Sequence, residues 1–433
     1  MDPLLAVVVL LAVLFLLLGL SLWVFVSLFS VALVSIALFT STPPLRLLGN
    51  IAWNATDSWA LVALPLFIFM GELLLRTRIS ERMFDGLAPW LAGLPGRLLH
   101  TNVVASTIFA AVSGSSAATA ATIGKINIPE LRKRGYDDDL ILGSLAGAGT
   151  LGFLIPPSLV MIIYGVLAEV SIGQLFIAGV IPGLMLAGGF MLYLVYAGLR
   201  WPEKAPAGDR YTWADRLRGL VDLLPVTLLI VFVLGSIYVG FATPTESAAI
   251  GVLGSLILAL AYRSLTWESF VQAVLGSVRT TSMIGLIIAG ASLLSTAMGF
   301  MGIPTALAEW IASLGLSKYM LVLVIALFYI VLGFFLDGIS MIVITLPITL
   351  PLVTQAGFSP LWFGIFLVLM VEAAQITPPV GFNLFVIQGV AGAPILRVAR
   401  AALPFFAILM GLAAVITLWP EIVLYLPRLM RGG

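Results

Sequence analysis

The sequence predicts an all-α polytopic membrane protein with an inverted-topology repeat. First, 61% of its 433 residues are hydrophobic and only 9% are charged, whereas soluble domains carry about 25% charged residues. Second, the prolines of residues 129–182 recur at one interval of 222 residues. The four pairs are Pro129 with Pro351, Pro156 with Pro378, Pro157 with Pro379, and Pro182 with Pro404. Third, 16 of the 21 Lys and Arg residues fall on one side of the predicted layout, as the positive-inside rule requires.

Composition excludes several classes of function. The chain has no cysteine, so it has no disulfide and no thiol chemistry, and its single histidine, His100, excludes a histidine-rich metal site. A net charge of +1 does not favour a nucleic-acid partner. The sequence contains no Walker loop, HExxH motif or Ser-His-Asp set, and we therefore expect no enzyme activity.

Hydropathy divides the chain into ten crossings of the bilayer, each long enough to span about 30 Å of hydrocarbon. The apolar run 4–39 has neither a basic leading region nor a cleavage signal, so we interpret it as two mature spans. The predicted crossings are residues 4–20, 22–40, 58–76, 139–168, 174–199, 220–240, 245–262, 282–301, 362–390 and 401–420.

Two further apolar stretches, 98–128 and 318–351, do not fit as simple spans. Each consists of two short arms around a polar or small-residue tip, Ser113–Ser116 in the first and Asp337–Ser340 in the second. Such a pattern predicts re-entrant hairpins, which are tolerated where the tip is buried in protein or faces water.

The double prolines predict that two of the crossings are broken helices. Pro156-Pro157 interrupts 139–168, and Pro378-Pro379 interrupts 362–390, because proline lacks the N–H that continues a helix. Paired interruptions in two hydrophobic halves indicate the binding site of a secondary transporter.

Charge places the two repeats in opposite orientations. With an external N-terminus and re-entrant hairpins, only Arg46, Lys318, Arg428 and Arg431 lie outside, and Lys125 lies within the first hairpin. Five crossings then separate equivalent points of the repeats, and an odd number inverts the second copy. The first hairpin is expected to open to the cytoplasm and the second to the outside.

Weaker similarity extends the repeat upstream, to two segments that we expect to be surface helices, 78–94 and 303–314. The predicted organisation follows from these elements. It comprises N-terminal scaffold helices (1–60), the first repeat (61–199), a cytoplasmic connector (200–218), further scaffold helices (219–280), the second repeat (281–420) and a C-terminal tail (421–433).

The broken helices and hairpin tips suggest a chemistry. Backbone carbonyls freed by a break suit a small hard cation such as Na⁺, and the N-termini of half-helices suit a carboxylate. Two acids within the membrane, Asp337 and Glu372, are functional candidates because an unpaired charge is costly there. Glu246 follows Thr243-Pro244-Thr245 at a span end, where we expect it to cap a helix.

At these motifs the chain resembles the large membrane subunit of tripartite ATP-independent periplasmic (TRAP) transporters. Many relatives carry an acid where this chain has Thr119, so a role for an acid there does not transfer. The matching segments are residues 113–121 with Pro129 and 134–136, then 152–158, Thr243–Glu246, Leu336–Gly338 and Ile376–Phe385.

The resemblance implies an inner-membrane permease of bacteria or archaea that is driven by a sodium gradient and carries a carboxylate, such as a C4-dicarboxylate, a sialic acid or a keto acid. It implies two partners, a small four-helix membrane subunit, expected as a separate chain, and a periplasmic substrate-binding protein. It also implies an elevator mechanism, in which the hairpins and broken helices move against a scaffold.

The resemblance further assigns residues to sites. One Na⁺ is expected at the first tip and break, on Ser113, Gly114, Ser115, Gly152, Leu154 and Pro156. A second is expected at the second tip and break, on Asp337, Gly338, Ile339, Thr377, Pro378 and Gly381. The substrate is expected between them, near Ser116, Ser158, Ser340 and Asn383.

Two other functions are compatible with the sequence. One is a self-sufficient sodium–dicarboxylate carrier of similar hairpin architecture that needs no binding protein. The other is a channel or a scaffold for membrane complexes. Transport by this chain alone would favour the first, and uptake that only equilibrates would favour a channel.

Overall fold

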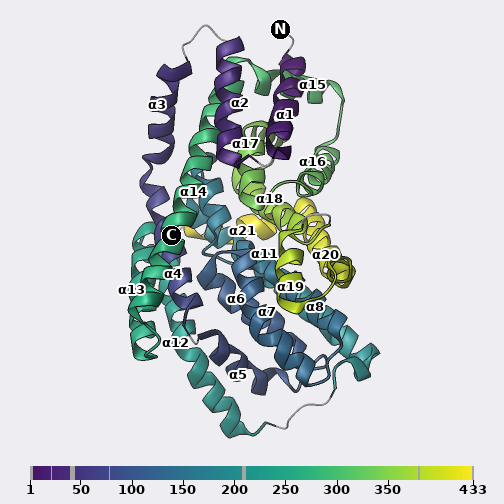
Figure 1. Ribbon diagram of the computed structural model, residues 1–433. Helices are drawn as coiled ribbons and strands as arrows, with labels where there is room; N and C mark the ends of the chain where they lie inside the picture. Colours follow the sequence, from purple (N-terminus) through teal and green to yellow (C-terminus); the bar gives the residue numbers. More distant parts are fainter. Residues whose placement is uncertain are drawn as a thin grey trace.

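All regular structure in the described part of the chain is helical (Figure 1). A computed structural model describes residues 3–20, 22–39, 44–77, 79–206, 211–378 and 381–431. Within these ranges, seven helices are long and apolar enough to cross a membrane, or eight if one bent pair counts as a span. The predicted all-α polytopic class is therefore confirmed.

The N-terminal region contains one helix that hydropathy does not predict. α1 (Pro3–Gly19) and α2 (Val24–Phe39) match the first two predicted spans, and η1 (Trp59–Val62) with α4 (Ala63–Leu75) matches the third. Between them lies α3 (Pro44–Thr56), which bends by 58° into the following segment. Its polar residues lower the mean hydropathy of the segment below that of a span, although the sequence is amphipathic at helical spacing.

The first half contains the expected helix–tip–helix and broken-helix units. After α5 (Ile79–Leu91), α6 (Leu99–Ser113) and α7 (Ser116–Lys133) contact each other as the arms of a hairpin. The predicted span 139–168 is divided into three helices, followed by one long helix. These are α8 (Asp138–Gly149), α9 (Leu151–Leu154), α10 (Leu159–Leu167) and α11 (Ile172–Arg200).

Two helices of the middle region begin earlier than predicted. After η2 (Pro202–Lys204), α12 (Trp213–Tyr238) starts inside the predicted connector, because Thr212 forms a capping box with Asp215. α13 (Pro244–Ala261) follows, and then α14 (Trp267–Phe300), which starts at a capping box between Thr266 and Ser269 rather than at residue 282. Because the first turns of α12 and α14 are polar, an average of hydropathy along the sequence places the starts of these helices too late.

The second half repeats the pattern of the first, and its end differs from the prediction. Most of the predicted C-terminal tail, residues 421–433, forms a helix that the sequence did not predict, α21, whose Val423 is fully buried and which packs on α11. The helices are α15 (Ile303–Ser313), α16 (Lys318–Leu332), α17 (Gly338–Gln355), α18 (Pro360–Gln375), α19 (Phe382–Ala391), α20 (Ile395–Leu418) and α21 (Glu421–Arg431).

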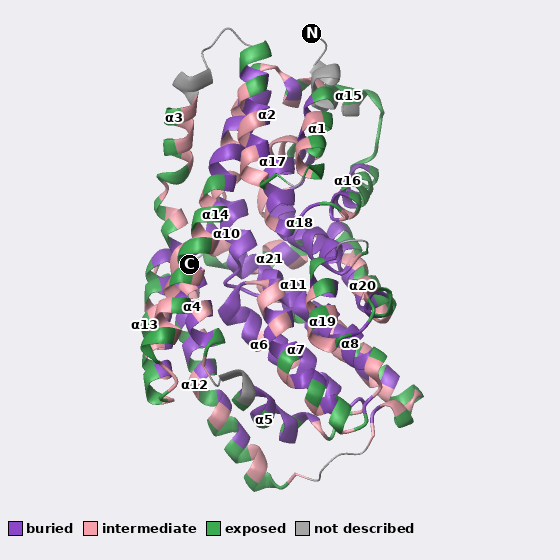
Figure 2. Ribbon diagram, viewed as in Figure 1, coloured by how far each residue is buried: buried purple, intermediate pink, exposed green. Residues whose placement is uncertain are grey.

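Burial separates a protected centre from exposed outer helices. Figure 2 shows buried residues concentrated in α6–α10 and α18, with many exposed residues on α12 and α13. Within the most apolar 18 residues of the segment Asp138–Leu167, 89% of the residues are buried. Within the most apolar 18 residues of α12, 28% are buried. The first break therefore lies inside protein, where a helix can be interrupted without exposing its backbone to lipid.

Candidate substrate and ion site

One cavity of about 500 Å³ brings both hairpin tips together. The first tip contributes Ser115 and Ala117, and the second contributes the whole segment Asp337–Ser340. Phe153 of the first break, Gln375 at the end of α18 and Phe382 at the start of α19 complete one side. The remaining lining residues belong to α14 and the beginning of α2: Trp23, Val24, Phe25, Thr280, Met283 and Ile287.

The first tip packs on the first break through backbone atoms. Gly114 ends α6 in the left-handed region, with φ +59°, and its carbonyl accepts a hydrogen bond from Leu159 N–H at 3.3 Å. A Cβ on Gly152 would lie 2.5 Å from the Ser115 carbonyl oxygen. Only glycine permits this approach. The structure thus places Gly152 and the tip segment 113–116 side by side.

Oxygen atoms gather at the first tip. Ser113 Oγ lies 2.9 Å from Thr119 Oγ1, and Thr119 Oγ1 donates to the Ser115 carbonyl at 2.8 Å. Leu154 and Pro156 are buried in the break beside it. Hard cations take oxygen ligands, and this set of hydroxyl and carbonyl oxygens has that character.

The second tip is organised by an acid. Asp337 caps α17 and accepts hydrogen bonds from Ile339 N–H at 3.1 Å, from Ser340 N–H at 3.3 Å, and from the Ser340 hydroxyl. Gly338 fits against α18, where a Cβ would lie 2.4 Å from Val371 Cγ1. The Asp337 side chain therefore acts as a helix cap on the cavity wall. Glu246 also caps a helix as predicted, through a capping box with Thr243.

The second break begins directly after Gln375. Thr377 Oγ1 donates to the Ala373 carbonyl at 2.6 Å, as hydroxyls on membrane helices often do. Gly381 starts α19 with φ +44°, and a Cβ there would lie 2.9 Å from the Thr377 carbonyl oxygen. Pro378 is exposed, and its neighbours Pro379 and Val380 lie outside the described residues.

Glu372 joins the two halves of the chain next to Phe153, which lines the cavity. Its Oε1 accepts a hydrogen bond from Phe153 N–H at 2.8 Å, and its Oε2 lies 3.0 Å from Ser116 Oγ. The side chain is fully buried. The sequence marked Glu372 as a candidate acid but assigned it to no site, because its partners lie 219 and 256 positions away along the chain.

The four predicted substrate residues do not form one surface. Asn383 Nδ2 donates to Ser116 Oγ at 2.8 Å, so these two meet, but both are fully buried. Ser158 is also buried and caps α10 by accepting from Met161 N–H at 3.3 Å. Of the four, only Ser340 lines the cavity. The other three are not among its lining residues.

The cavity has an acidic side chain and no basic one among its described lining residues, which is unusual for a site that binds an anion. Among the described residues that line it, Asp337 is the only charged side chain. An anion there would depend on helix N-termini, such as those of α7 and α19, or on bound cations. The described residues contain no cluster of three or more His, Cys, Asp or Glu side chains able to hold a metal ion.

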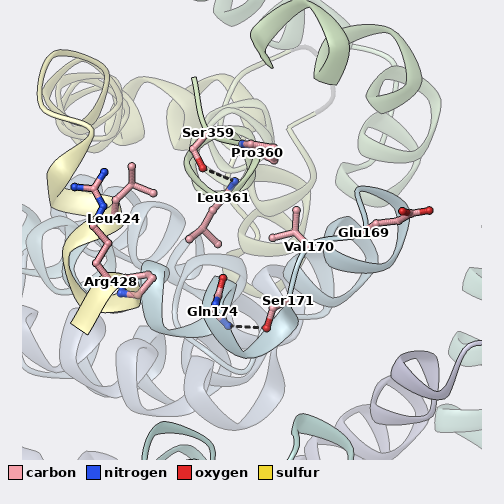
Figure 3. Close-up of a pocket in the computed structure, with 10 residues that line it drawn as sticks. Glu169, Val170, Ser171, Gln174, Ser359, Pro360, Leu361, Leu424 and Arg428 are labelled. Carbon is pink, nitrogen blue, oxygen red and sulfur yellow. Dashed lines mark hydrogen bonds between the residues drawn. The ribbon is translucent and has the colours of Figure 1, made fainter. Parts of the chain in front are cut away.

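A second cavity lies elsewhere and holds none of the predicted site residues. It has a volume of about 430 Å³ between the α10–α11 turn, the start of α18 and α21 (Figure 3). Two capping serines face it, Ser171 bonded to Gln174 N–H and Ser359 bonded to Leu361 N–H. Glu169 and Arg428 stand at its rim.

A family model and several curated relatives indicate one family. The family model of the "Tripartite ATP-independent periplasmic transporter, DctM component" matches residues 9–422. The chain belongs to this family. It is a TRAP large permease subunit, and the resemblance seen in its motifs is confirmed.

Curated TRAP permeases match along most of the chain. The C4-dicarboxylate TRAP large permease protein DctM of Pseudomonas aeruginosa is 36% identical over 392 residues, covering 90% of this chain and 91% of that protein. The sialic acid TRAP large permease SiaM of Vibrio cholerae is 30% identical over 409 residues, covering 93% and 95%. These relatives are permeases rather than enzymes, as predicted.

Two further matches bear on subunit organisation and fold. The isethionate TRAP permease DctMQ of Oleidesulfovibrio alaskensis is 33% identical over 383 residues, which cover 88% of this chain and 60% of that protein. The crystal structure of the YdaH transporter of Alcanivorax borkumensis superposes with a TM-score of 0.64, covering 87% of this chain and 89% of that one. At 15% identity, that match shows a shared fold only.

Proposed function

We propose that this TRAP subunit couples the entry of Na⁺ to the uptake of an organic acid. The observation that carries the proposal is the cavity that both hairpin tips share with helices α2 and α14. A site built from two inverted copies can be reached from either side of the membrane in turn, which is the requirement for alternating access.

The substrate is an organic anion that binds between the tips. Relatives are named as permeases for C4-dicarboxylates, sialic acid, isethionate and ectoine. The cavity wall carries no cationic side chain among its described residues, so the anion needs another source of positive charge. Sodium ions at the two tips supply it, and this dependence couples the ions to the substrate.

The two ions occupy the oxygen-lined breaks. One is held at Ser113–Ser115 with the backbone of 152–156. Support comes from the hydroxyl and carbonyl oxygens that lie together at this tip and from the close approach of Gly152 to the Ser115 carbonyl. The other is held at Asp337–Ile339 with Thr377, Pro378 and Gly381, beside the Asp337 carboxylate. Each ion stabilises a tip against its break, which is the geometry that closes the cavity around substrate.

The hairpins and broken helices move as a transport unit against a scaffold that includes α2, α12, α13 and α14. Support comes from the packing: α14 contacts α2, α3 and α4, and α12 contacts α5 and α13, whereas α7 and α8 contact α19. The cavity lies where the two groups meet. Movement across this boundary would carry the site through the membrane as an elevator.

The working transporter lies in the inner membrane, with the N-terminus outside. It includes a small membrane subunit and a periplasmic protein that delivers the substrate. In the isethionate relative, a longer permease named DctMQ matches this chain over part of its length. The small subunit of the present system is proposed as a separate chain.

Reconstitution tests the proposal directly. The subunit is placed in proteoliposomes with its small subunit and substrate-loaded binding protein, and labelled uptake is followed with and without an inward Na⁺ gradient. We expect accumulation above the external concentration only with Na⁺ and all three proteins. Accumulation by this chain alone would support a self-sufficient carrier, and uptake that stops at equilibrium would contradict coupling.

A further inference from the structure

A third cavity, of about 520 Å³, lies where α8 begins, α11 ends and α20 begins. The proposed orientation places these three helix ends on the cytoplasmic side, and α20 packs on both of the other helices. Of the described residues assigned to the ion and substrate sites, none lines this cavity. Its wall instead carries three basic and two acidic side chains: Lys204, Arg397, Arg400, Asp137 and Asp139.

The acids around this cavity do not neutralise all of its bases. Arg397 Nε lies 2.6 Å from an Asp139 oxygen, so this arginine is paired. Lys204 Nζ lies 3.6 Å from an Asp137 oxygen, at the long end of the range for an ion pair. Arg400 is exposed and has no acidic partner in the part of the chain that the structure describes. The cavity therefore presents uncompensated positive charge, which favours an anionic ligand.

The helix faces that lead away from this cavity are apolar and exposed. On α20, Leu396 and Leu403 stand about one turn before and after Arg400, and both side chains are mostly exposed. On α11, Leu192 and Leu199 are also mostly exposed. Both helices are long and apolar enough to cross a membrane, so these leucines face the acyl chains of lipid. An arginine between two such leucines has the lipid headgroups as its nearest polar surroundings.

Aromatic residues place the cavity at the level of the headgroups. Trp201 lines it, and the ring of Trp201 lies edge-on to that of Tyr196, with their centroids 6.0 Å apart. The cations of Arg200 and Lys204 stand 5.7 Å and 5.5 Å from the centre of the Trp201 ring. Trp and Tyr are enriched where the membrane meets water. The basic cavity thus opens at the boundary between headgroups and hydrocarbon.

We propose that this cavity binds an anionic phospholipid of the cytoplasmic leaflet. Arg400 and Lys204 hold the phosphate of the headgroup, and the acyl chains lie along the exposed leucines of α11 and α20. Basic pockets between membrane helices on this side of the bilayer suit such headgroups. A soluble anion would meet the same cations, but it would leave the apolar faces beside them uncovered. The inference requires the proposed orientation in the membrane, but neither sodium coupling nor a particular substrate.

The test measures lipid binding to the purified complex of this subunit with its small subunit, stripped of lipid in detergent. Native mass spectrometry gives the affinity of the tightest-bound phosphatidylglycerol, with zwitterionic phosphatidylcholine as the reference. Arg400→Gln combined with Lys204→Gln removes two charges from the cavity. We expect this double variant to bind phosphatidylglycerol about 30-fold more weakly than the wild type, because each cation near a headgroup contributes about fivefold in affinity. Binding of phosphatidylcholine should change little.

The matched control is Arg218→Gln combined with Arg263→Gln. Both of these arginines are exposed and lie outside the cavity, so their removal should leave the tightest-bound phosphatidylglycerol in place.

Two further measurements separate lost binding from misfolding and a lipid from a soluble anion. Arg400→Lys keeps the charge and should bind phosphatidylglycerol as the wild type does, and the double glutamine variant should unfold at the wild-type temperature when no lipid is present. Inorganic phosphate should not displace the bound lipid, because it has no acyl chains to cover the leucines. Equal affinity of the wild type and the double glutamine variant for phosphatidylglycerol would overturn the proposal. Equal affinity of the wild type for both lipids, or displacement by phosphate, would overturn it as well.

Discussion

Asn383 Nδ2 donates a hydrogen bond to Ser116 Oγ at 2.8 Å, across 267 positions of sequence. Ser116 begins the second arm of the first hairpin, and Asn383 lies in the first turn of the helix after the second break. The bond therefore joins the first hairpin directly to the helix that follows the second break. Both side chains are fully buried, so the contact is shielded from water.

The hydrogen bond between Ser116 and Asn383 should be measurable as an interaction energy in a double-mutant cycle. Ser116→Ala and Asn383→Ala should each lower the free energy of unfolding of the purified subunit. The double variant should lose less free energy of unfolding than the two single variants lose together, and the difference, the interaction energy, should be about 0.5–3 kcal/mol. Thermal unfolding in detergent measures the cycle. Strict additivity would mean that the two halves are not coupled through this contact.

Removing the Glu372 carboxylate should lower the free energy of unfolding more than removing an exposed carboxylate does. Glu372→Ala leaves the buried Phe153 N–H without an acceptor, whereas the Ser116 hydroxyl keeps the Gly149 carbonyl, and the change should lower the free energy of unfolding by about 1–3 kcal/mol. Glu372→Gln keeps an acceptor for Phe153 and should retain most of the stability. Glu203→Ala, on the exposed connector, is the control and should change stability by less than about 0.5 kcal/mol. Equal effects at positions 372 and 203 would contradict this role.

The glycine at the first break should tolerate no side chain. Gly152→Ala places a Cβ 2.5 Å from the Ser115 carbonyl oxygen and from Ser116 N, so the tip must move away from the break. We expect Na⁺-dependent uptake to fall at least about tenfold, since the oxygen set at the tip is lost. Gly188→Ala in α11 is the matched control, because nothing lies within 4 Å of its Cβ. If both variants transport equally, the tip–break contact is not required.

The inverted orientation can be tested with single cysteines, because the chain contains none of its own. Lys133→Cys, at the end of α7, and Gln355→Cys, at the end of α17, occupy corresponding exposed ends of the two hairpins. A membrane-impermeant maleimide applied from outside intact cells should label position 355 and leave position 133 unlabelled. Labelling of both positions from the same side would refute the inversion.

The sequence predicted the units of this fold better than their connections. Double prolines and glycine-containing tips are local signals, so both breaks and both hairpins were located from residues that stand beside one another. α3 and α21 were missed, because each is an amphipathic helix whose mean hydropathy resembles that of a loop. The predicted starts of α12 and α14 were too late in the sequence. Hydropathy does not detect their polar first turns, whereas capping boxes at Thr212 and Thr266 start both helices earlier.

The site was harder to predict than the fold, because its contacts join distant parts of the chain. Pairing of Glu372 with Phe153 and Ser116 depends on how the halves pack, and no local pattern encodes it. The same packing buries Ser116, Ser158 and Asn383 and places Gln375 on the cavity wall. Position 375 carries no motif of its own, and only the folded chain places it on the cavity wall.

The central claim is that one site couples sodium to an organic anion. It is tested most directly by counting radioactive sodium and labelled substrate that enter the same proteoliposomes, with the small subunit and the loaded binding protein present. The account predicts a fixed ratio of ions to substrate, with both fluxes lost together in Gly152→Ala. Substrate entry without accompanying sodium would contradict it.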